Sequence, residues 1–363
     1  MKPHNEDTRV KIPTILHLMR LGYTYLSLKG DEAKGIAKPV WDKNNNIFTD
    51  IFNESLYKLN PSINEHDVKQ CYDELALFLE NKDLGKAFYE KLISRSGIRL
   101  IDFENFNNNQ FHVVTELTCK NGEDEFRPDI TLLINGLPLV FIEVKKPNNL
   151  GGTLEEKNRL EVRQSNTSFR TFFNITQLML FSNNMPYEEN TIKPVQGAFY
   201  AASSYSKTHF NYFREEDTFS LNELLVPLTD EQENQVLFDN NLISIKSEKE
   251  FTENKKPTTH THQICTSMLQ RERLAFLLEY GFAYVKGEKS LEKHIMRYPQ
   301  LFATKAIEST LERGNKKGII WHTQGSGKTA LSYFNVRYLT NYFKHKGKVA
   351  KFYFIVDRIS LLI

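Results

Sequence analysis

The stretch RPDITLLINGLPLVFIEVKKP, residues 127–147, decides the fold class of this 363-residue chain. It contains two apolar, β-rich runs, residues 127–134 and 137–145, which are separated by Asn135-Gly136. An Asn-Gly pair between two such runs is a strong signal for a β-hairpin. The sequence therefore predicts a hairpin here, as part of a larger sheet.

Three charged residues, Asp129, Glu143 and Lys145, stand within this otherwise apolar hairpin. A turn of two residues would place Asp129 opposite Ile142 and send Glu143 to the other face. A three-residue loop that ends at Leu137 pairs Asp129 with Glu143 and keeps Lys145 beside them. We predict the three-residue loop, because it leaves the opposite face uniformly apolar. That face then carries Ile130, Leu132, Ile134, Val140, Ile142 and Val144.

The charged face of the hairpin suits metal-assisted hydrolysis of a phosphodiester. Two carboxylates form a hard oxygen site for Mg²⁺, and a lysine two residues after one of them can orient an attacking water. The plainer alternative, an edge hairpin with solvated charges, is disfavoured by the alternation typical of a buried face. Pro128-Asp129 and Glu143-Val144-Lys145 resemble the PD-(D/E)xK nuclease signature. The resemblance implies that Asp129, Glu143 and the Val144 carbonyl bind metal, and that Lys145 positions the nucleophile.

A second motif, WHTQGSGKT at residues 321–329, resembles a phosphate-binding loop of superfamily 2 helicases. Backbone N–H groups and a helix N-terminus would bind phosphate, with Lys328 at the β- and γ-phosphates and Thr329 on Mg²⁺. The strict Walker pattern has glycine where His322 stands, but the Gly-x-Gly-Lys-Thr core is complete. The plainer alternative is a structural turn that binds no nucleotide.

The two motifs in this order resemble the N-terminal part of the restriction (R) subunit of type I restriction–modification enzymes. LGYTY at residues 21–25 and RYPQ at residues 297–300 resemble further stretches of that family. The resemblance implies a Mg²⁺-dependent endonuclease for double-stranded DNA, an ATP-driven translocase, and assembly with separate methylation (M) and specificity (S) subunits. It places ATP against Gln300 and the phosphate loop. The loop residues are Thr323, Gln324, Gly325, Ser326, Gly327, Lys328 and Thr329.

Two departures from the family pattern matter. The family carries a Gln-x-x-x-Tyr pair after the catalytic lysine, but neither Gln164 nor Gln177 has a tyrosine four residues later, so no residue is assigned that role. A polar insert at residues 148–165 occupies this place and is expected to be disordered. The chain stops at Ile363, before any Asp-Glu-x-His motif or arginine finger, so the motor is expected to be incomplete.

The composition is typical of a cytoplasmic globular protein with room for about two domains. The three cysteines are widely spaced and odd in number, which argues against a disulfide framework or a zinc site. The N-terminus lacks an apolar leader and no run of 18 apolar residues occurs, so no membrane association is expected. A net charge of only +2 means that DNA contacts must come from local clusters such as Lys145-Lys146.

We predict an α/β chain in three parts. Residues 1–246 form a PD-(D/E)xK nuclease-like mixed sheet flanked by helices, residues 247–263 a polar linker, and residues 264–363 an incomplete RecA-like P-loop domain. His260 and His262 in the linker are expected to be solvated rather than bound to metal. Helices are expected over 63–80, 84–92, 172–181 and about 330–342, and strands over 111–119, 197–202, 318–321 and 351–356.

Two other functions stay open at this point. One is a nuclease–helicase of DNA repair or recombination, which the family-like stretches at residues 21–25 and 297–300 disfavour. The other is a non-catalytic DNA-binding assembly module, which the intact Asp129, Glu143 and Lys145 disfavour. The recognised DNA sequence cannot be read from this chain, because recognition in this family belongs to the S subunit.

Overall fold

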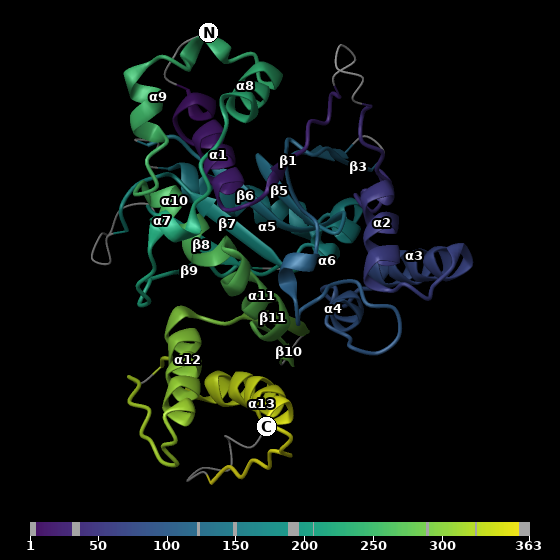
Figure 1. Cartoon of the computed structure of the whole chain (residues 1–363), viewed down its shortest axis with the longest axis vertical. Coiled ribbons are helices and arrows are strands. Elements are labelled where there is room, and N and C mark those ends of the chain that lie inside the picture. Colours follow the sequence, from purple (N-terminus) through teal and green to yellow (C-terminus); the bar gives the residue numbers. More distant parts are fainter. Residues whose placement is uncertain are drawn as a thin grey trace.

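A seven-stranded mixed sheet organises the chain (Figure 1), in the order β1-β2-β5-β6-β7-β8-β9. The pairs β1–β2 and β6–β7 are parallel, and the other neighbours are antiparallel. The strands are β1 (Thr24–Tyr25), β2 (Phe111–Thr115), β5 (Ile130–Ile134), β6 (Leu137–Val144), β7 (Leu178–Ser182), β8 (Ala198–Ala201) and β9 (Asn211–Tyr212). The predicted α/β class with a mixed sheet is confirmed. This computed structural model describes residues 5–30, 37–121, 124–147, 151–187, 196–205, 207–287, 290–323 and 325–355.

Helices surround this sheet, and two more lie together at the end of the molecule remote from α8 and α9 (Figure 1). Around the sheet are η1 (Asp7–Lys11), α1 (Ile12–Arg20), α2 (Thr49–Leu59), α3 (Glu65–Glu80), α4 (Lys86–Leu92), α5 (Gly152–Ser165), α6 (Arg170–Ile175), α7 (Leu221–Leu224), α8 (Asp230–Asp239), α9 (Lys249–Asn254), α10 (His260–Leu269) and α11 (Arg271–Tyr280). The hairpin β10–β11 (Phe282–Lys286, Leu291–Ile295) leads to the remote pair, α12 (Tyr298–Glu312) and α13 (Lys328–His345). A small hairpin, β3–β4 (Cys119–Asn121, Asp124–Phe126), stands beside the sheet. No helix in the described part of the chain is long and apolar enough to cross a membrane.

The turn of the β5–β6 hairpin differs from the predicted one. Ile134 pairs directly with Leu137, so the turn has two residues and the predicted three-residue loop is wrong. Asn135 (φ 51°) and Gly136 (φ 78°) both take the left-handed conformation that such a tight turn requires. The Asn135 amide is buried and donates a 2.8 Å hydrogen bond to the Leu100 carbonyl, which fixes the turn from outside the hairpin.

A β-bulge corrects the register that this turn alone would give. The pairing shifts by one residue within the hairpin, which leaves Leu139 as the extra residue on β6. Beyond the bulge Ile130 faces Ile142, and the next pair outward is therefore Asp129 and Glu143. The predicted side-by-side placement of the two carboxylates is confirmed, although a bulge produces it rather than a longer loop.

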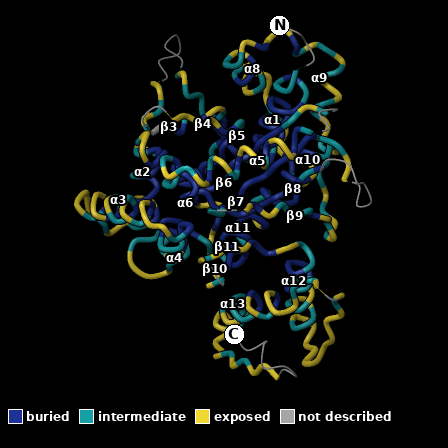
Figure 2. The backbone as a smooth tube through the Cα atoms, turned by 180° about the vertical axis from the view of Figure 1, so that it is seen from behind, coloured by how far each residue is buried: buried dark blue, intermediate teal, exposed yellow. Residues whose placement is uncertain are grey.

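The two faces of the hairpin pack against different cores. The predicted apolar face is confirmed, because its side chains lie in the large core shared with α1, α10 and α11. The other face of β6, which also carries Glu143, packs Phe141 against an aromatic cluster with α5 and α6. Figure 2 shows that these strands are buried along most of their length. The members of the aromatic cluster include Phe126, Phe141, Phe169, Phe172, Phe173 and Phe181.

The helix predicted over residues 172–181 is only partly present. Helix α6 ends at Ile175, and β7 starts at Leu178 and runs parallel to β6. All five residues of β7 are buried, since both faces of the sheet are covered. A short apolar run of this kind fits a buried strand or a buried helix equally well by its pattern, and the pairing with β6 decides for the strand.

Two polar segments are folded where disorder or a linker was predicted. Residues 152–165 of the insert form α5, whereas residues 148–150 lie outside the described residues. The predicted linker contains α9 and the start of α10, and His262 is buried rather than solvated, with its ring stacked on that of His17 at 4.4 Å. The linker is therefore part of the folded body. The domain boundaries themselves stay a prediction.

The predicted strands beside the phosphate loop are not formed. Residues 318–321 and 351–355 pair with no other described segment, and residue 356 lies outside the described range. Their apolar side chains are open to solvent; Trp321 is 89% exposed and Ile355 98%. The predicted helix after the loop is confirmed as α13, with Gly327 in a left-handed N-cap conformation.

Candidate active site

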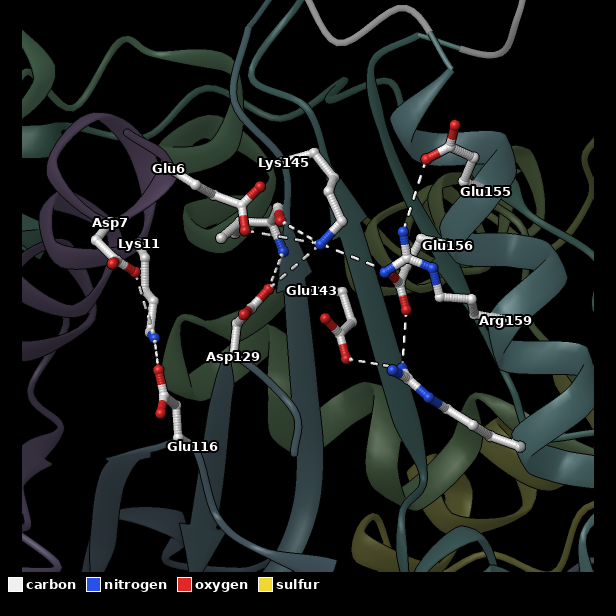
Figure 3. Close-up of polar contacts among 12 residues, drawn as sticks. Glu6, Asp7, Lys11, Glu116, Asp129, Glu143, Lys145, Glu155, Glu156 and Arg159 are labelled. Carbon is white, nitrogen blue, oxygen red and sulfur yellow. Dashed lines mark hydrogen bonds and ion pairs between the residues drawn. The ribbon is translucent and has the colours of Figure 1, made fainter. Parts of the chain in front are cut away.

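The structure brings the three predicted nuclease residues together at one edge of the sheet (Figure 3). Asp129 lies directly before β5, and its Oδ2 accepts a 2.9 Å hydrogen bond from the Val144 N–H. Lys145 Nζ lies 3.9 Å from Asp129 Oδ2 and donates a 2.9 Å hydrogen bond to the Val144 carbonyl. The lysine therefore contacts two of the oxygens that the nuclease resemblance assigns to a metal.

Glu143 is the most constrained member of the site. Its side chain is 5% exposed, and Oε1 is buried without a hydrogen-bond partner among the described residues. Burial raises the pKa of Glu143 well above its usual value, and the nearby carboxylates of Asp129 and Glu156 raise it further. An unsatisfied carboxylate oxygen in a buried position is costly unless a cation completes it.

Two carboxylates of the site were missed by sequence reasoning. Lys145 Nζ lies 3.7 Å from Glu6 and 3.5 Å from Glu156 Oε2, in addition to its contact with Asp129 (Figure 3). Burial alone would lower the pKa of Lys145, but the carboxylates of Asp129, Glu156 and Glu6 outweigh it and raise this pKa. Lys145 is therefore a stable cation surrounded by acidic groups.

An arginine of α5 completes the cluster. Arg163 Nη1 lies 2.9 Å from Glu156 Oε1 and 3.6 Å from Glu143 Oε1, and its guanidinium stacks 4.6 Å from the centre of the Phe126 ring. Glu156 and Arg163 are seven residues apart, which places them on one face of a helix. That spacing was the available signal, but it has meaning only once residues 152–165 are known to be helical.

The residues present fit a hard divalent cation. Asp129 and Glu143 supply carboxylate oxygens, and the Val144 carbonyl lies beside them. One of these oxygens, Glu143 Oε1, has no hydrogen-bond partner among the described residues. Among the described residues no group of three or more His, Cys, Asp or Glu side chains forms a full metal cage. A site with few protein ligands suits Mg²⁺, which usually keeps several of its waters.

The phosphate loop is arranged differently from the nuclease edge. Lys328 is exposed, and its Nζ donates hydrogen bonds to the carbonyls of His322 (2.9 Å) and Thr323 (3.1 Å) in its own loop. Gln300 Nε2 donates to the Gly327 carbonyl at 3.1 Å, so α12 contacts the loop at the N-cap residue directly before α13. Gly325, Ser326 and Thr329 lie in the same turn and first helical residues, whereas Gln324 lies outside the described residues.

The chain is similar to proteins of restriction systems. The family described as "Type I restriction enzyme R protein N terminus" matches residues 3–210, and "Type III restriction enzyme, res subunit" matches residues 293–363. Two Methanocaldococcus jannaschii proteins with provisional names as type I restriction endonuclease subunits, MjaVIIP and MjaVIIIP, are 28% and 27% identical over 72% and 95% of this chain. The HindI endonuclease subunit of Haemophilus influenzae is 25% identical over 87% of it.

The chain spans about a fifth to a third of the length of the relatives that it matches: 21% of MjaVIIP, 30% of MjaVIIIP and 28% of the HindI subunit. The R-protein match covers more than half of the chain and includes every residue of the nuclease edge. The chain therefore belongs to the type I restriction enzyme R protein family.

Proposed function

We propose that this chain supplies the Mg²⁺-dependent cleavage of unmodified double-stranded DNA in a cytoplasmic type I restriction–modification complex. The observation that carries the proposal is the pairing of Asp129 with Glu143 at one sheet edge, with Lys145 held between carboxylates. In this proposal residues 1–246 are a PD-(D/E)xK nuclease domain. The family membership supports a restriction role, and the geometry supports a hydrolytic one.

Each residue of the edge has a role in this proposal. Asp129, Glu143 and the Val144 carbonyl would hold Mg²⁺, which supplies charge stabilisation at the phosphate and activation of a water. Lys145 would orient that water, because its ammonium already lies beside the Val144 carbonyl and Asp129. Glu6 and Glu156 hold Lys145 from the other sides, so they are positioning residues rather than metal ligands.

The second half of the proposal concerns the phosphate loop. We infer that residues 264–363 belong to a RecA-like motor domain that binds ATP and Mg²⁺ through the loop, with Lys328 at the phosphates and Thr329 on the metal. The match of residues 293–363 to the res-subunit family supports this assignment. DNA translocation and assembly with M and S subunits are properties proposed for the whole protein.

The test uses the full-length R protein assembled with its M and S subunits. Asp129→Ala, Glu143→Ala and Lys145→Ala should each reduce cleavage of unmodified DNA at least about 10³-fold, since each removes a group that acts on the reacting phosphate. ATP hydrolysis by the same complexes should persist, because the phosphate loop is a separate site. Cleavage is followed on a circular plasmid with ATP and Mg²⁺.

Glu155→Gln is the matched control. Glu155 lies next to Glu156 on α5, but its side chain points to solvent and pairs only with Arg159 among the described residues. This variant should cleave at the wild-type rate. If all three site variants cleave normally, the nuclease assignment is wrong and the chain serves assembly instead.

A further inference from the structure

We propose that the guanidinium of Arg163 takes the place of a second metal ion, so that this nuclease edge works with a single divalent cation. The proposal rests on the proposed function and specifies its metal requirement. Hydrolytic sites for phosphodiesters use one ion or two, and in two-ion sites the ions lie about 3.5–4 Å apart. The nuclease edge has two places where carboxylates converge, and a protein cation lies at each.

The first place is the proposed metal site of Asp129, Glu143 and the Val144 carbonyl, and Lys145 lies at its Asp129 side. Lys145 is held by ion pairs of 3.5–3.9 Å and one hydrogen bond, on a flexible stem of four carbons. Those distances are longer than direct hydrogen bonds to the carboxylates. The ammonium can therefore move aside while it stays within the same ring of acidic groups.

The second place is formed by Glu143 and Glu156, and Arg163 lies between them. Its Nη1 makes a 2.9 Å hydrogen bond to Glu156 and a longer ion pair of 3.6 Å to Glu143, so one cation lies between two carboxylates. The planar guanidinium also stacks on Phe126, and Phe126 packs within the aromatic cluster under the sheet. The Phe126 ring thus holds the guanidinium of Arg163 in place, whereas no aromatic ring packs against the ammonium of Lys145 among the described residues.

Glu156 has no oxygen left for a second ion. Oε1 is bound by Arg163, and Oε2 lies 3.3 Å from Arg159 Nη1 and 3.5 Å from Lys145 Nζ. The side chain is nearly fully buried, so it cannot turn to solvent to present another oxygen. A divalent cation placed here would face three protein cations at short range, and that repulsion excludes it.

Arg163 also suits the work that a second ion would do. Among the described residues its guanidinium donates a hydrogen bond only to Glu156, which leaves other N–H groups for a phosphate oxygen. An arginine binds such oxygens in a planar fork and keeps its charge at any working pH. Arg163 thus supplies a positive charge beside Glu143, at the place where a second ion would otherwise lie.

The experiment counts ions directly. Mn²⁺ binding to the full-length R protein without nucleotide is followed by electron paramagnetic resonance, and the ions of this site are those lost when Asp129→Ala or Glu143→Ala is added to the protein. We expect one such ion in the wild type and two in Arg163→Met, because the methionine frees Glu143 and Glu156 for metal. Arg163→Gln, which keeps a polar planar group, is the second variant if the methionine protein does not fold.

Arg159→Met is the matched control. Arg159 lies one helical turn before Arg163 and also pairs with Glu156, but it is half-exposed and does not contact Glu143 among the described residues. This variant should still bind one ion. Two ions in the wild type, or one in both the wild type and the Arg163 variants, would overturn the inference while leaving the nuclease assignment intact. A wild type that loses no ion in Asp129→Ala would instead contradict the proposed function.

Discussion

The nuclease edge and the phosphate loop are both built around a lysine, yet their surroundings are opposite. Lys145 lies in a partly buried ring of three carboxylates: Glu6 directly before η1, Asp129 directly before β5, and Glu156 of α5. Lys328 is exposed and contacts only carbonyls of its own loop among the described residues. The first lysine is positioned by residues from across the sequence, and the second by its immediate neighbours.

This difference shows what each site needs from the rest of the chain. The charged groups of the nuclease edge already pair with one another before any ligand binds, and removing one of them would leave its partners without a counter-charge. The phosphate loop has its local turn and helix start, but the apolar residues beside it are open to solvent. The conformation of the phosphate loop is therefore determined by its own residues, whereas the arrangement of the nuclease edge depends on tertiary contacts with the rest of the fold.

The contrast should be largest in a pair of aromatic truncations. Phe141→Ala removes a fully buried ring beneath the nuclease edge and should lower the free energy of unfolding by about 3–5 kcal/mol. Trp321→Ala removes an even larger ring that is almost fully exposed, and should change the free energy of unfolding by less than about 0.5 kcal/mol. Urea unfolding followed by circular dichroism measures both. Equal losses would mean that the segment before the phosphate loop is packed.

An intermediate effect should appear in acid, from the stacked pair His17 and His262 in the body. Burial lowers the pKa of His262 to about 4, and burial together with His262 lowers the pKa of His17 well below its usual value. In the unfolded chain both histidines bind a proton below about pH 6.5, whereas in the folded chain they stay neutral. The free energy of unfolding therefore falls as the pH drops from about 6.5 to about 4. For His262 the loss is about 3 kcal/mol.

The variant His262→Asn tests the source of this loss. Asparagine keeps a donor for the Lys256 carbonyl, to which His262 Nδ1 donates at 2.7 Å, but it cannot be protonated in this range. Unfolding free energies measured between pH 4 and 7 should depend less on pH in this variant than in the wild type. An unchanged slope would place the acid sensitivity in the carboxylates instead.

The parts of the fold that sequence predicted are those determined locally. Asn135-Gly136 marks a hairpin by its own conformational preference, and residues 65–80 mark a helix by their spacing, as α3 confirms. The position of the bulge at Leu139 is different, because the pairing of a whole strand with its neighbours decides it. The sequence therefore predicted that Asp129 and Glu143 lie side by side, but not that a two-residue turn with a β-bulge brings them together.

The missed residues of the nuclease edge share one property. Glu6, Glu156 and Arg163 join the site through ion pairs with Lys145 and Glu143 of the hairpin, and the only local signal, the spacing of Glu156 and Arg163, does not reveal those pairs. Arg163 and Glu156 also lie in a polar segment whose composition favours disorder, and the buried ion pairs that stabilise it as α5 are tertiary contacts. The metal-binding roles of Asp129 and Glu143 stay predictions, because they concern a ligand.

The smallest effect on stability, and a large one on function, is expected from Lys328→Ala. The ammonium is exposed and donates only to two carbonyls of its own loop, which water can satisfy, so the free energy of unfolding should change by less than about 0.5 kcal/mol. In the full-length assembled protein the same change should lower ATP turnover at least about 10²-fold, because a cation at the transferred phosphate is lost.

Lys346→Ala, at the other end of α13, is the matched control, since Lys346 is an exposed lysine paired with Glu312 away from the loop. Both unfolding and ATP turnover are measured for the two variants. A clear loss of stability in Lys328→Ala would show that the loop is held as firmly as the nuclease edge, and normal ATP turnover would remove the loop from the nucleotide site.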